Sequence, residues 1–230
     1  ETFQKASNDP ARTAPAVRRA AVEGLALLGG ADSVAALGRL ARFSPRELGP
    51  RAALGLGALG GGAARVELAA LLAGGQRPGD TGPATEHALR ARGRCGQPED
   101  TGAVRALHKA PLGTRLKRAA ICALAGLGGA EADAEVVRRL ADPEPGVVSA
   151  ATWAAGQLRV AAAVPALVKR LKAPGGTAGR APRALALIGD AAVSQPLLDL
   201  VSSRSLLTAP GQILDRAEAL WALGVLGERK

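Results

Sequence analysis

Bulky side chains are nearly missing from this sequence of 230 residues. It has no tyrosine and no methionine, and only two tryptophans and two phenylalanines, so it lacks the groups that usually fill one compact core. Alanine and glycine take their place with 52 and 30 copies, and apolar residues still make up 47% of the chain. That share is ordinary for a folded protein and far above that of a disordered chain. We therefore expect a folded protein built on small residues, without a single compact core.

The cysteines and the apolar runs bear on where the protein works. Two cysteines, Cys95 and Cys122, exclude the multi-disulfide framework of small secreted domains and leave one bridge between them open. Charged residues or glycines interrupt every apolar run before it reaches the roughly 18 residues of a membrane span. The chain begins with Glu1, which is typical of a processed or truncated protein. We expect no membrane span, and a compartment that is open between the cytoplasm, which we favour, and export to the periplasm.

An internal repeat of about 31 residues runs along the chain. In each copy an Ala-rich segment ends on an aliphatic residue or a cysteine, and we take the residue that follows as the reference of that copy. The reference residues are Gly29, Gly60, Gly96, Gly128, Arg159, Gly189 and Gly227. The position eight residues before the reference is alanine in all seven copies. These alanines are Ala21, Ala52, Ala88, Ala120, Ala151, Ala181 and Ala219.

The other recurring positions follow a helical period. Positions eight, four and one before the reference share one face of a helix. The position five before the reference is small in every copy, which predicts that neighbouring helices approach closely there. It holds Gly24, Gly55, Ala91, Ala123, Ala154, Ala184 and Ala222. A second segment is aliphatic eight residues after the reference, at Leu37, Leu68, Val104, Val136, Leu167 and Leu197. Each copy is therefore predicted to be a pair of amphipathic helices, a first helix and a second helix.

This pattern resembles the HEAT repeats, and in particular the short bacterial HEAT-like repeats also found in phycobilin lyases. The clearest copies run from Leu116 to Leu140 and from Asp142 to Leu171, and the resemblance covers about Val17 to Gly227. It implies an all-α, right-handed solenoid of about seven helix pairs, the last of them incomplete, in one domain over residues 1–230. The repeats would cover about 14–45, 46–76, 81–112, 113–142, 143–174, 177–204 and 211–230. Because the matching residues are packing residues, the resemblance implies an architecture and no specific activity.

The charge of the chain indicates the kind of partner. A net charge of +10 and a pI near 10.9 favour an acidic protein or a nucleic acid. We expect the second helices to line the concave surface of the solenoid, and nearly every one carries a basic residue. We call these residues the basic ridge: Arg39, Arg42, Arg65, Arg105, Lys109, Arg138, Lys169 and Lys172.

The basic ridge leaves two binding functions open. The first is a non-enzymatic scaffold for protein–protein interaction that holds an extended acidic partner on its concave face. The second is a nucleic-acid-binding protein that uses the same ridge, although the chain has few aromatic side chains for base stacking. A third interpretation is that these side chains only keep the exposed sides of the helices solvated.

Three further residues stand out against the repeat pattern. Trp153 and Trp221 occupy the same position, six before the reference, and are candidates either for packing between repeats or for exposed contact with a partner. Arg92 stands four before the reference, where leucine is expected, so its charge needs a partner. Either its helix is shifted, or Arg92 binds an acidic group of a partner as a further exposed contact. A nearby carboxylate could also pair with it: Glu86, Glu99 or Asp100.

No catalytic or metal site is legible in the sequence. The histidines and cysteines, His87, Cys95, His108 and Cys122, lie within one stretch, but their spacings match none of the ligand pairs that zinc uses. No nucleophile stands with a base in a recognisable arrangement, and no glycine-rich loop precedes a lysine and a hydroxyl residue. Nothing identifies a tetrapyrrole pocket or a glycosylase site. The sequence therefore predicts no enzyme, no metal and no cofactor.

The seventh copy consists of a first helix only. Leu220, Trp221, Leu223 and Leu226 crowd this helix, and the second helix expected after it is missing before Lys230. Solenoids need a capping element at each end. We therefore expect a longer array or end-to-end self-association.

Overall fold

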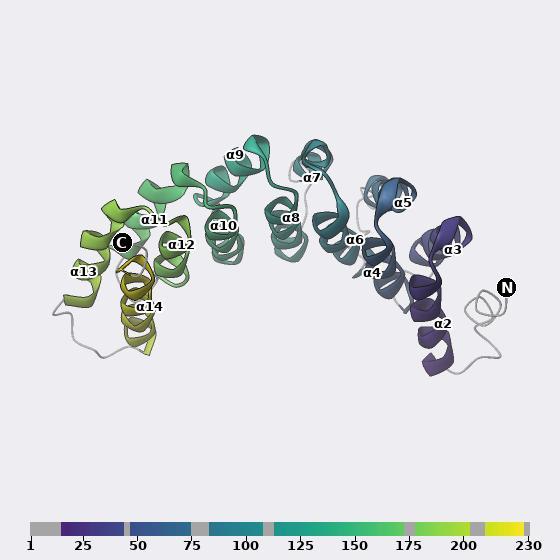
Figure 1. Cartoon of the computed structure of the whole chain (residues 1–230), viewed down its shortest axis with the longest axis horizontal. Helices are drawn as coiled ribbons and strands as arrows, with labels where there is room; N and C mark the ends of the chain where they lie inside the picture. Colours follow the sequence, from purple (N-terminus) through teal and green to yellow (C-terminus); the bar gives the residue numbers. More distant parts are fainter. Residues whose placement is uncertain are drawn as a thin grey trace. The chain divides into compact units, whose positions relative to one another are not determined.

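The computed structural model describes residues 15–43, 47–74, 83–107, 113–172, 178–202 and 210–227, and all regular structure in these ranges is helical (Figure 1). The α-helices are α2 (Pro15–Leu28), α3 (Gly30–Phe43), α4 (Gly49–Leu59), α5 (Gly61–Gly74), α6 (Pro83–Cys95), α7 (Thr101–Leu107), α8 (Thr114–Leu127), α9 (Ala130–Arg139), α10 (Pro145–Leu158), α11 (Val164–Leu171), α12 (Ala181–Ile188), α13 (Ser194–Ser202) and α14 (Pro210–Gly227). Short 3₁₀ turns at Pro98–Asp100, Ala161–Ala163 and Ala191–Val193 precede α7, α11 and α13. The predicted all-α chain of helix pairs is confirmed.

The chain forms two compact units, Glu1–Gly128 and Gly129–Lys230, which we call unit 1 and unit 2. The boundary falls between α8 and α9, inside the predicted fourth repeat. The single domain over 1–230 and the limits of its repeats stay predictions.

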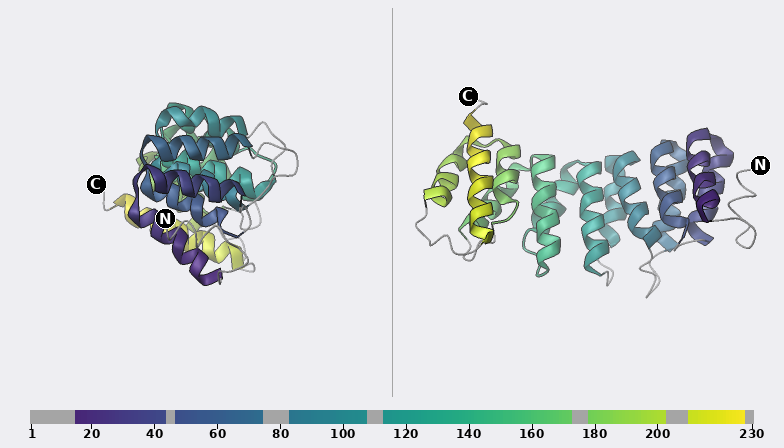
Figure 2. Two further views of the ribbon diagram at one scale, coloured as in Figure 1. Left: turned by 90° about the vertical axis from the view of Figure 1, so that its right-hand side faces the viewer. Right: turned by 90° about the horizontal axis from the view of Figure 1, so that it is seen from below.

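Each unit consists of two layers of helices. In unit 1 the first helices α2, α4, α6 and α8 pack side by side, and the second helices α3, α5 and α7 lie on the other side of them (Figure 2). In unit 2 the first helices α10, α12 and α14 form the corresponding layer, against α9, α11 and α13. The recurring alanines of the first helices lie in the core between the layers, since Ala52, Ala88 and Ala120 are fully buried.

Glycine lets successive first helices approach closely. A Cβ added to Gly57 would lie 2.6 Å from the Ala91 Cβ, and one added to Gly93 would lie 2.7 Å from the Ala123 Cα. In unit 2 a Cβ on Gly156 would lie 2.8 Å from the Ala184 Cα. In each contact a glycine three before the reference meets the small residue five before the next reference. The predicted close approach is therefore confirmed at these three alanines, and we call these contacts the glycine seam.

The glycine seam also decides which layer lies on the inside of the curve. Within each unit, Figure 1 shows the first helices on the inner side and the second helices on the outer side. Helices that pack without intervening side chains are spaced more closely than their partners, so a stack of pairs bends toward them. The expectation that the second helices line the concave surface is wrong within each unit.

Arg92 is buried and paired within the chain. Only 5% of it is exposed, its Nη2 lies 2.6 Å from Asp100 Oδ1, and its Nη1 donates to the Arg65 carbonyl oxygen at 2.9 Å. The other Asp100 oxygen accepts from the Gln97 N–H at 3.0 Å. Of the interpretations of Arg92, the paired one is confirmed, and an exposed contact at Arg92 is wrong. The pair ties α6 to the turn before α7.

Asp100 stays ionised in this environment. Burial by itself raises the pKa of the carboxyl, but the hydrogen bond from the Gln97 N–H and the charges of Arg92 and Arg65 outweigh it, so the pKa of Asp100 lies below its ordinary value. A carboxyl with a lowered folded-state pKa stabilises the fold fully above its unfolded pKa and loses that contribution as the pH falls through the folded pKa.

We expect Gly93→Ala to destabilise unit 1 by about 1–3 kcal/mol, because the new methyl group meets backbone atoms of α8 that cannot yield. The matched control is Gly102→Ala in α7, where a Cβ has no neighbour within 4 Å. There alanine should stabilise the helix by up to about 1 kcal/mol. Urea unfolding followed by circular dichroism measures both. A Gly93→Ala protein as stable as the parent would contradict the glycine seam.

We expect Asp100→Asn to cost about 3 kcal/mol or more at neutral pH, because it leaves the buried Arg92 charge without a countercharge. The difference from the parent should shrink as the pH falls from about 5 to about 2, where Asp100 itself takes up a proton. Glu99→Gln, an exposed neighbour, is the control and should change stability by less than about 0.5 kcal/mol. Thermal unfolding across this pH range provides the comparison. A difference that stays constant with pH would show that the charge pair is not its source.

Candidate partner-binding face

Three members of the basic ridge form ion pairs with carboxylates of the chain itself, and two of these carboxylates also pair with a second arginine. Arg42 Nη1 lies 2.5 Å from Glu67 Oε2, and Arg65 Nε lies 3.4 Å from Asp100 Oδ2. Arg138 Nη2 lies 2.9 Å from Glu135 Oε2.

The remaining members are scattered over the second helices. Arg39, Lys169 and Lys172 are exposed and make no ion pair with any residue that the structure describes, whereas Arg105 is half-buried. Lys109, like His108, lies outside the described residues. The ridge is therefore not a continuous positive surface in either unit.

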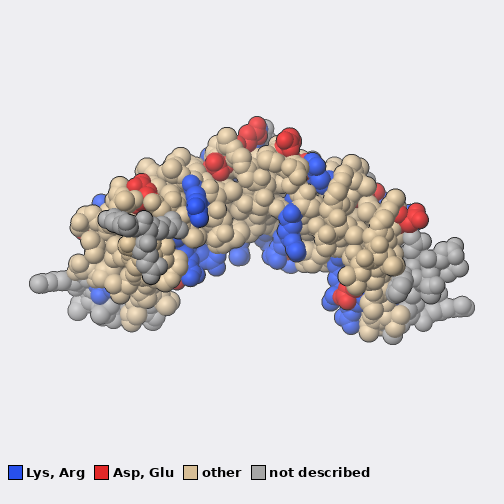
Figure 3. Space-filling model, in the orientation of Figure 1, with Lys and Arg blue, Asp and Glu red and all other residues tan. Residues whose placement is uncertain are grey.

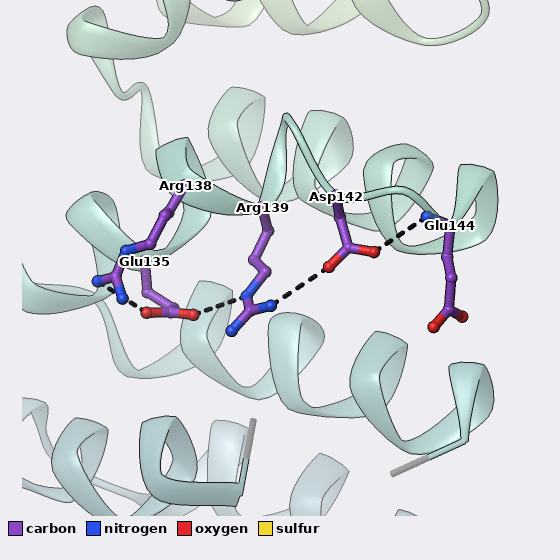
Figure 4. Close-up of polar contacts among 5 residues, drawn as sticks. All are labelled: Glu135, Arg138, Arg139, Asp142 and Glu144. Carbon is purple, nitrogen blue, oxygen red and sulfur yellow. Dashed lines mark hydrogen bonds and ion pairs between the residues drawn. The ribbon is translucent and has the colours of Figure 1, made fainter. Parts of the chain in front are cut away.

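Arg138 belongs to a network that fixes the turn between α9 and α10 (Figure 4). Glu135 is fully buried, and Arg139 Nε donates to its Oε1 at 2.7 Å while Arg138 binds Oε2. Arg139 Nη1 also donates to Asp142 Oδ2 at 3.2 Å, and Asp142 Oδ1 accepts from the Glu144 N–H at 3.0 Å. The network runs from α9 to the start of α10, so its arginines hold the fold of unit 2 together.

Basic side chains gather instead on the side of the first helices. In Figure 3, within each unit, lysine and arginine crowd the first-helix side, while most of the visible carboxylates lie on the second-helix side. We call the surface formed by the positions ten, six and two before each reference the first-helix face. These positions are one helical turn apart and point away from the second helices.

In unit 1 four exposed arginines surround one carboxylate. Arg90, Arg94 and Arg118 stand on this face, and Arg115 lies three residues before Arg118 on the same helix. Glu86 is 4% exposed, with its Oε1 2.8 Å from Arg90 Nη2 and its Oε2 in an ion pair with Arg115. Arg94 and Arg118 are exposed, and neither pairs with a carboxylate among the described residues. We call Arg90, Arg94, Arg115 and Arg118 the arginine cluster. One carboxylate leaves three of its four positive charges uncompensated.

The arginine cluster has a rigid base. Its side chains come from α6 and α8, whose backbones meet at Gly93 and Ala123 in the glycine seam. The ion pair between Arg115 and Glu86 joins the same two helices, and α8 itself contains no acidic residue. The backbone positions of the four arginines are therefore set by packed helices and do not depend on a loop.

In unit 2 the first-helix face is hollowed into a groove of about 820 Å³. Helices α10, α12 and α14 supply its walls. The lining residues are Trp153, Gln157, Gly179, Arg180, Arg183, Ala184, Leu187, Gly211, Leu214, Asp215, Glu218 and Trp221. Trp153, Arg183 and Trp221 all stand six before their references, so one repeat position supplies the centre of each wall. The Arg183 guanidinium carbon lies 4.7 Å from the centre of the Trp221 ring, within the range of a cation–π contact.

One buried carboxylate holds the shape of this groove. Asp215, on α14, is 5% exposed and accepts from the N–H groups of Ala178 and Gly179 at 3.1 and 2.9 Å. These two residues come just before α12, and Gly179 has a φ of +54°, which favours glycine. The contact fixes the entry of α12 against α14. Asp215 is therefore committed to the fold and is not available to a ligand.

The two tryptophans are partly exposed and line the groove, and their contact with a partner stays a prediction. Trp221 is 41% exposed and Trp153 is half-buried, so each packs on its own wall and still presents part of its ring to the groove. Sequence reasoning missed Arg180 and Arg183 as site residues. The signal was present for Arg183, which shares the repeat position of both tryptophans.

In the part of the chain that the structure describes, no three histidine, cysteine or acidic side chains are placed to hold a metal ion, and no helix is long and apolar enough to cross a membrane. Cys95 and Cys122 are half-buried and are not joined by a disulfide.

Comparison with known proteins bears on the fold. No protein-family model matches the chain, and no curated protein matches its sequence. Among solved structures, the archaeal HEAT-like repeats protein of Thermococcus onnurineus is similar with a TM-score of 0.57 and 12% identity, over 99% of this chain and 96% of that one. The complex of CpcE and CpcF of phycocyanin lyase from Nostoc is similar with a TM-score of 0.56 and 18% identity, over 98% and 92% of the two chains. With the helix pairs described above, these likenesses show that the chain has the fold of a HEAT-like helical solenoid.

Proposed function

We propose that this protein is a non-enzymatic scaffold that binds an extended acidic segment of another protein on the first-helix face of unit 1. The arginine cluster carries the proposal, because it presents three uncompensated positive charges on two helices that pack directly against each other. The proposal keeps the acidic partner and the concave side that the sequence indicated. It moves the contact from the second helices to the first.

The ion pairs favour the first helices over the second helices as the layer that binds the partner. Each exposed ion pair with a partner contributes at most about 1 kcal/mol, so useful affinity needs several cations close together. Among the second helices, α3 supplies Arg39 and α11 with its C-cap supplies Lys169 and Lys172 as exposed cations. Arg42, Arg65 and Arg138 already have carboxylate partners. In the arginine cluster, Arg94 and Arg118 can each take a carboxylate in the forked geometry that arginine favours.

A protein scaffold also agrees with the fold and with the composition. A helical solenoid offers a long surface of regularly spaced side chains, which suits an extended segment. The arginine cluster contains no aromatic side chain on which a base could stack: both tryptophans lie in unit 2, and the exposed Phe43 ends α3, a second helix. Binding of nucleic acid is therefore the outcome that the experiment must separate from the proposal.

We expect Arg94→Glu with Arg118→Glu to weaken binding of a fluorescein-labelled poly-glutamate peptide by at least about tenfold, because two attractions become repulsions. Fluorescence anisotropy with the full chain measures this, and the parent should lose affinity between roughly 50 and 200 mM salt. The matched control reverses two exposed cations of the second helices, Arg39→Glu with Lys169→Glu, and should change affinity by less than about twofold.

Two results would overturn the proposal. If the control pair weakens binding as much as the cluster pair, affinity follows total charge and the first-helix face has no special role. If duplex DNA binds more tightly than poly-glutamate at the same salt and loses affinity with the cluster variant, the face binds nucleic acid.

A further inference from the structure

We infer that the groove of unit 2 is an anchoring pocket for one aromatic side chain of a partner protein. In the partner's sequence, acidic residues flank this aromatic residue. The inference rests on the proposed function in taking the partner to be an acidic segment. It goes further in naming a second, separate site and the side chain that this site selects.

The composition of the groove is unusual for this chain. Only four aromatic residues occur among 230, and both tryptophans line this one groove. Tryptophan and arginine are the residues most enriched where binding energy is concentrated at protein interfaces. A groove of about 820 Å³ is in the range of sites that enclose a bound group, and it has room for one aromatic side chain with its neighbouring backbone.

The walls offer flat surfaces to a ring. Helix α12 packs between α10 and α14, so Arg183 stands between the helices that carry Trp153 and Trp221. The contact with Trp221 orients the Arg183 guanidinium, and 56% of that side chain remains exposed. A ring from a partner can stack on these planes, and Leu187 and Leu214 add apolar contact around it.

Two arginines and two carboxylates line the groove, but Asp215 is buried and hydrogen-bonded, so the exposed charges favour an acidic flank over a basic one. Arg180 is exposed and pairs with no carboxylate among the described residues, while Arg183 has only Glu218 near it, with 3.8 Å between Nε and Oε2. A cation of the partner would be repelled by both arginines. It could not make a cation–π contact with the Trp221 ring, because Arg183 already makes one. A carboxylate beside the aromatic residue can pair with Arg180, which comes just before α12, whereas Glu218 stands on the α14 wall.

Tryptophan emission reports on this groove alone, because the chain has no tyrosine and both tryptophans line it. We would titrate the full chain with three short blocked peptides. One has a phenylalanine between two pairs of glutamates, the second has alanine in its place, and the third keeps the phenylalanine between pairs of lysines. The first should change the emission saturably and bind at least about tenfold more tightly than the other two.

Variants locate the site. Trp221→Ala and Arg180→Glu should each weaken binding of the phenylalanine peptide by at least about tenfold, and Trp153 still reports binding in both. Leu220→Ala removes an exposed apolar neighbour of Trp221 that does not line the groove, and should have no effect. Arg94→Glu with Arg118→Glu should also leave this binding unchanged, which separates the groove from the arginine cluster.

The outcomes are distinguishable. Equal affinity for the phenylalanine and alanine peptides would overturn the aromatic pocket, even if poly-glutamate binding to unit 1 holds. Tighter binding of the lysine peptide would overturn the acidic flank. Loss of binding in Leu220→Ala equal to that in Trp221→Ala would show that the groove is not the site.

Discussion

The close approach of successive first helices is the constraint on which the rest of the structure depends. At Gly57, Gly93 and Gly156 a single missing Cβ lets one helix backbone meet the next. A chain with almost no aromatic residues fills the core between its layers with leucine and alanine, and the close contacts of small groups in the seam add to this packing. The glycine seam places the first helices on the inner side of each unit and thereby decides which side chains meet there.

The same constraint separates structure from recognition within one helix. Positions eight, five, four and three before the reference are used by the core and the seam, so they are small or aliphatic in every copy except at Arg92. The positions six and two before the reference are left to face outward, and they vary from Arg90 to Trp153 and Arg183. Two different surfaces result on one scaffold, a charged one in unit 1 and an aromatic groove in unit 2. Recognition can therefore change at these positions without a cost in packing.

Much of the fold was predictable from the sequence, and the site was predictable in part. The seven alanines and the small residues after them define helices and seams, because burial leaves a periodic trace. No periodic pattern in the sequence indicates which layer lies on the inner side of each unit. The expectation that the basic ridge lines the concave surface was therefore wrong. The ion pairs of Arg42 with Glu67 and of Arg65 with Asp100 could not be predicted either, since each carboxylate comes from another segment of the chain. Arg92 was resolved only by geometry, whereas Arg183 could have been found from the repeat position that it shares with the tryptophans.

The most direct test of this account is a footprint of the arginines. Phenylglyoxal modifies exposed guanidinium groups, and mass spectrometry of the full chain with and without poly-glutamate shows which of them the ligand covers. The account predicts that Arg94 and Arg118 are protected while Arg39, exposed on a second helix, reacts as before. Protection of Arg39 with no change at Arg94 and Arg118 would contradict it and return the binding surface to the second helices.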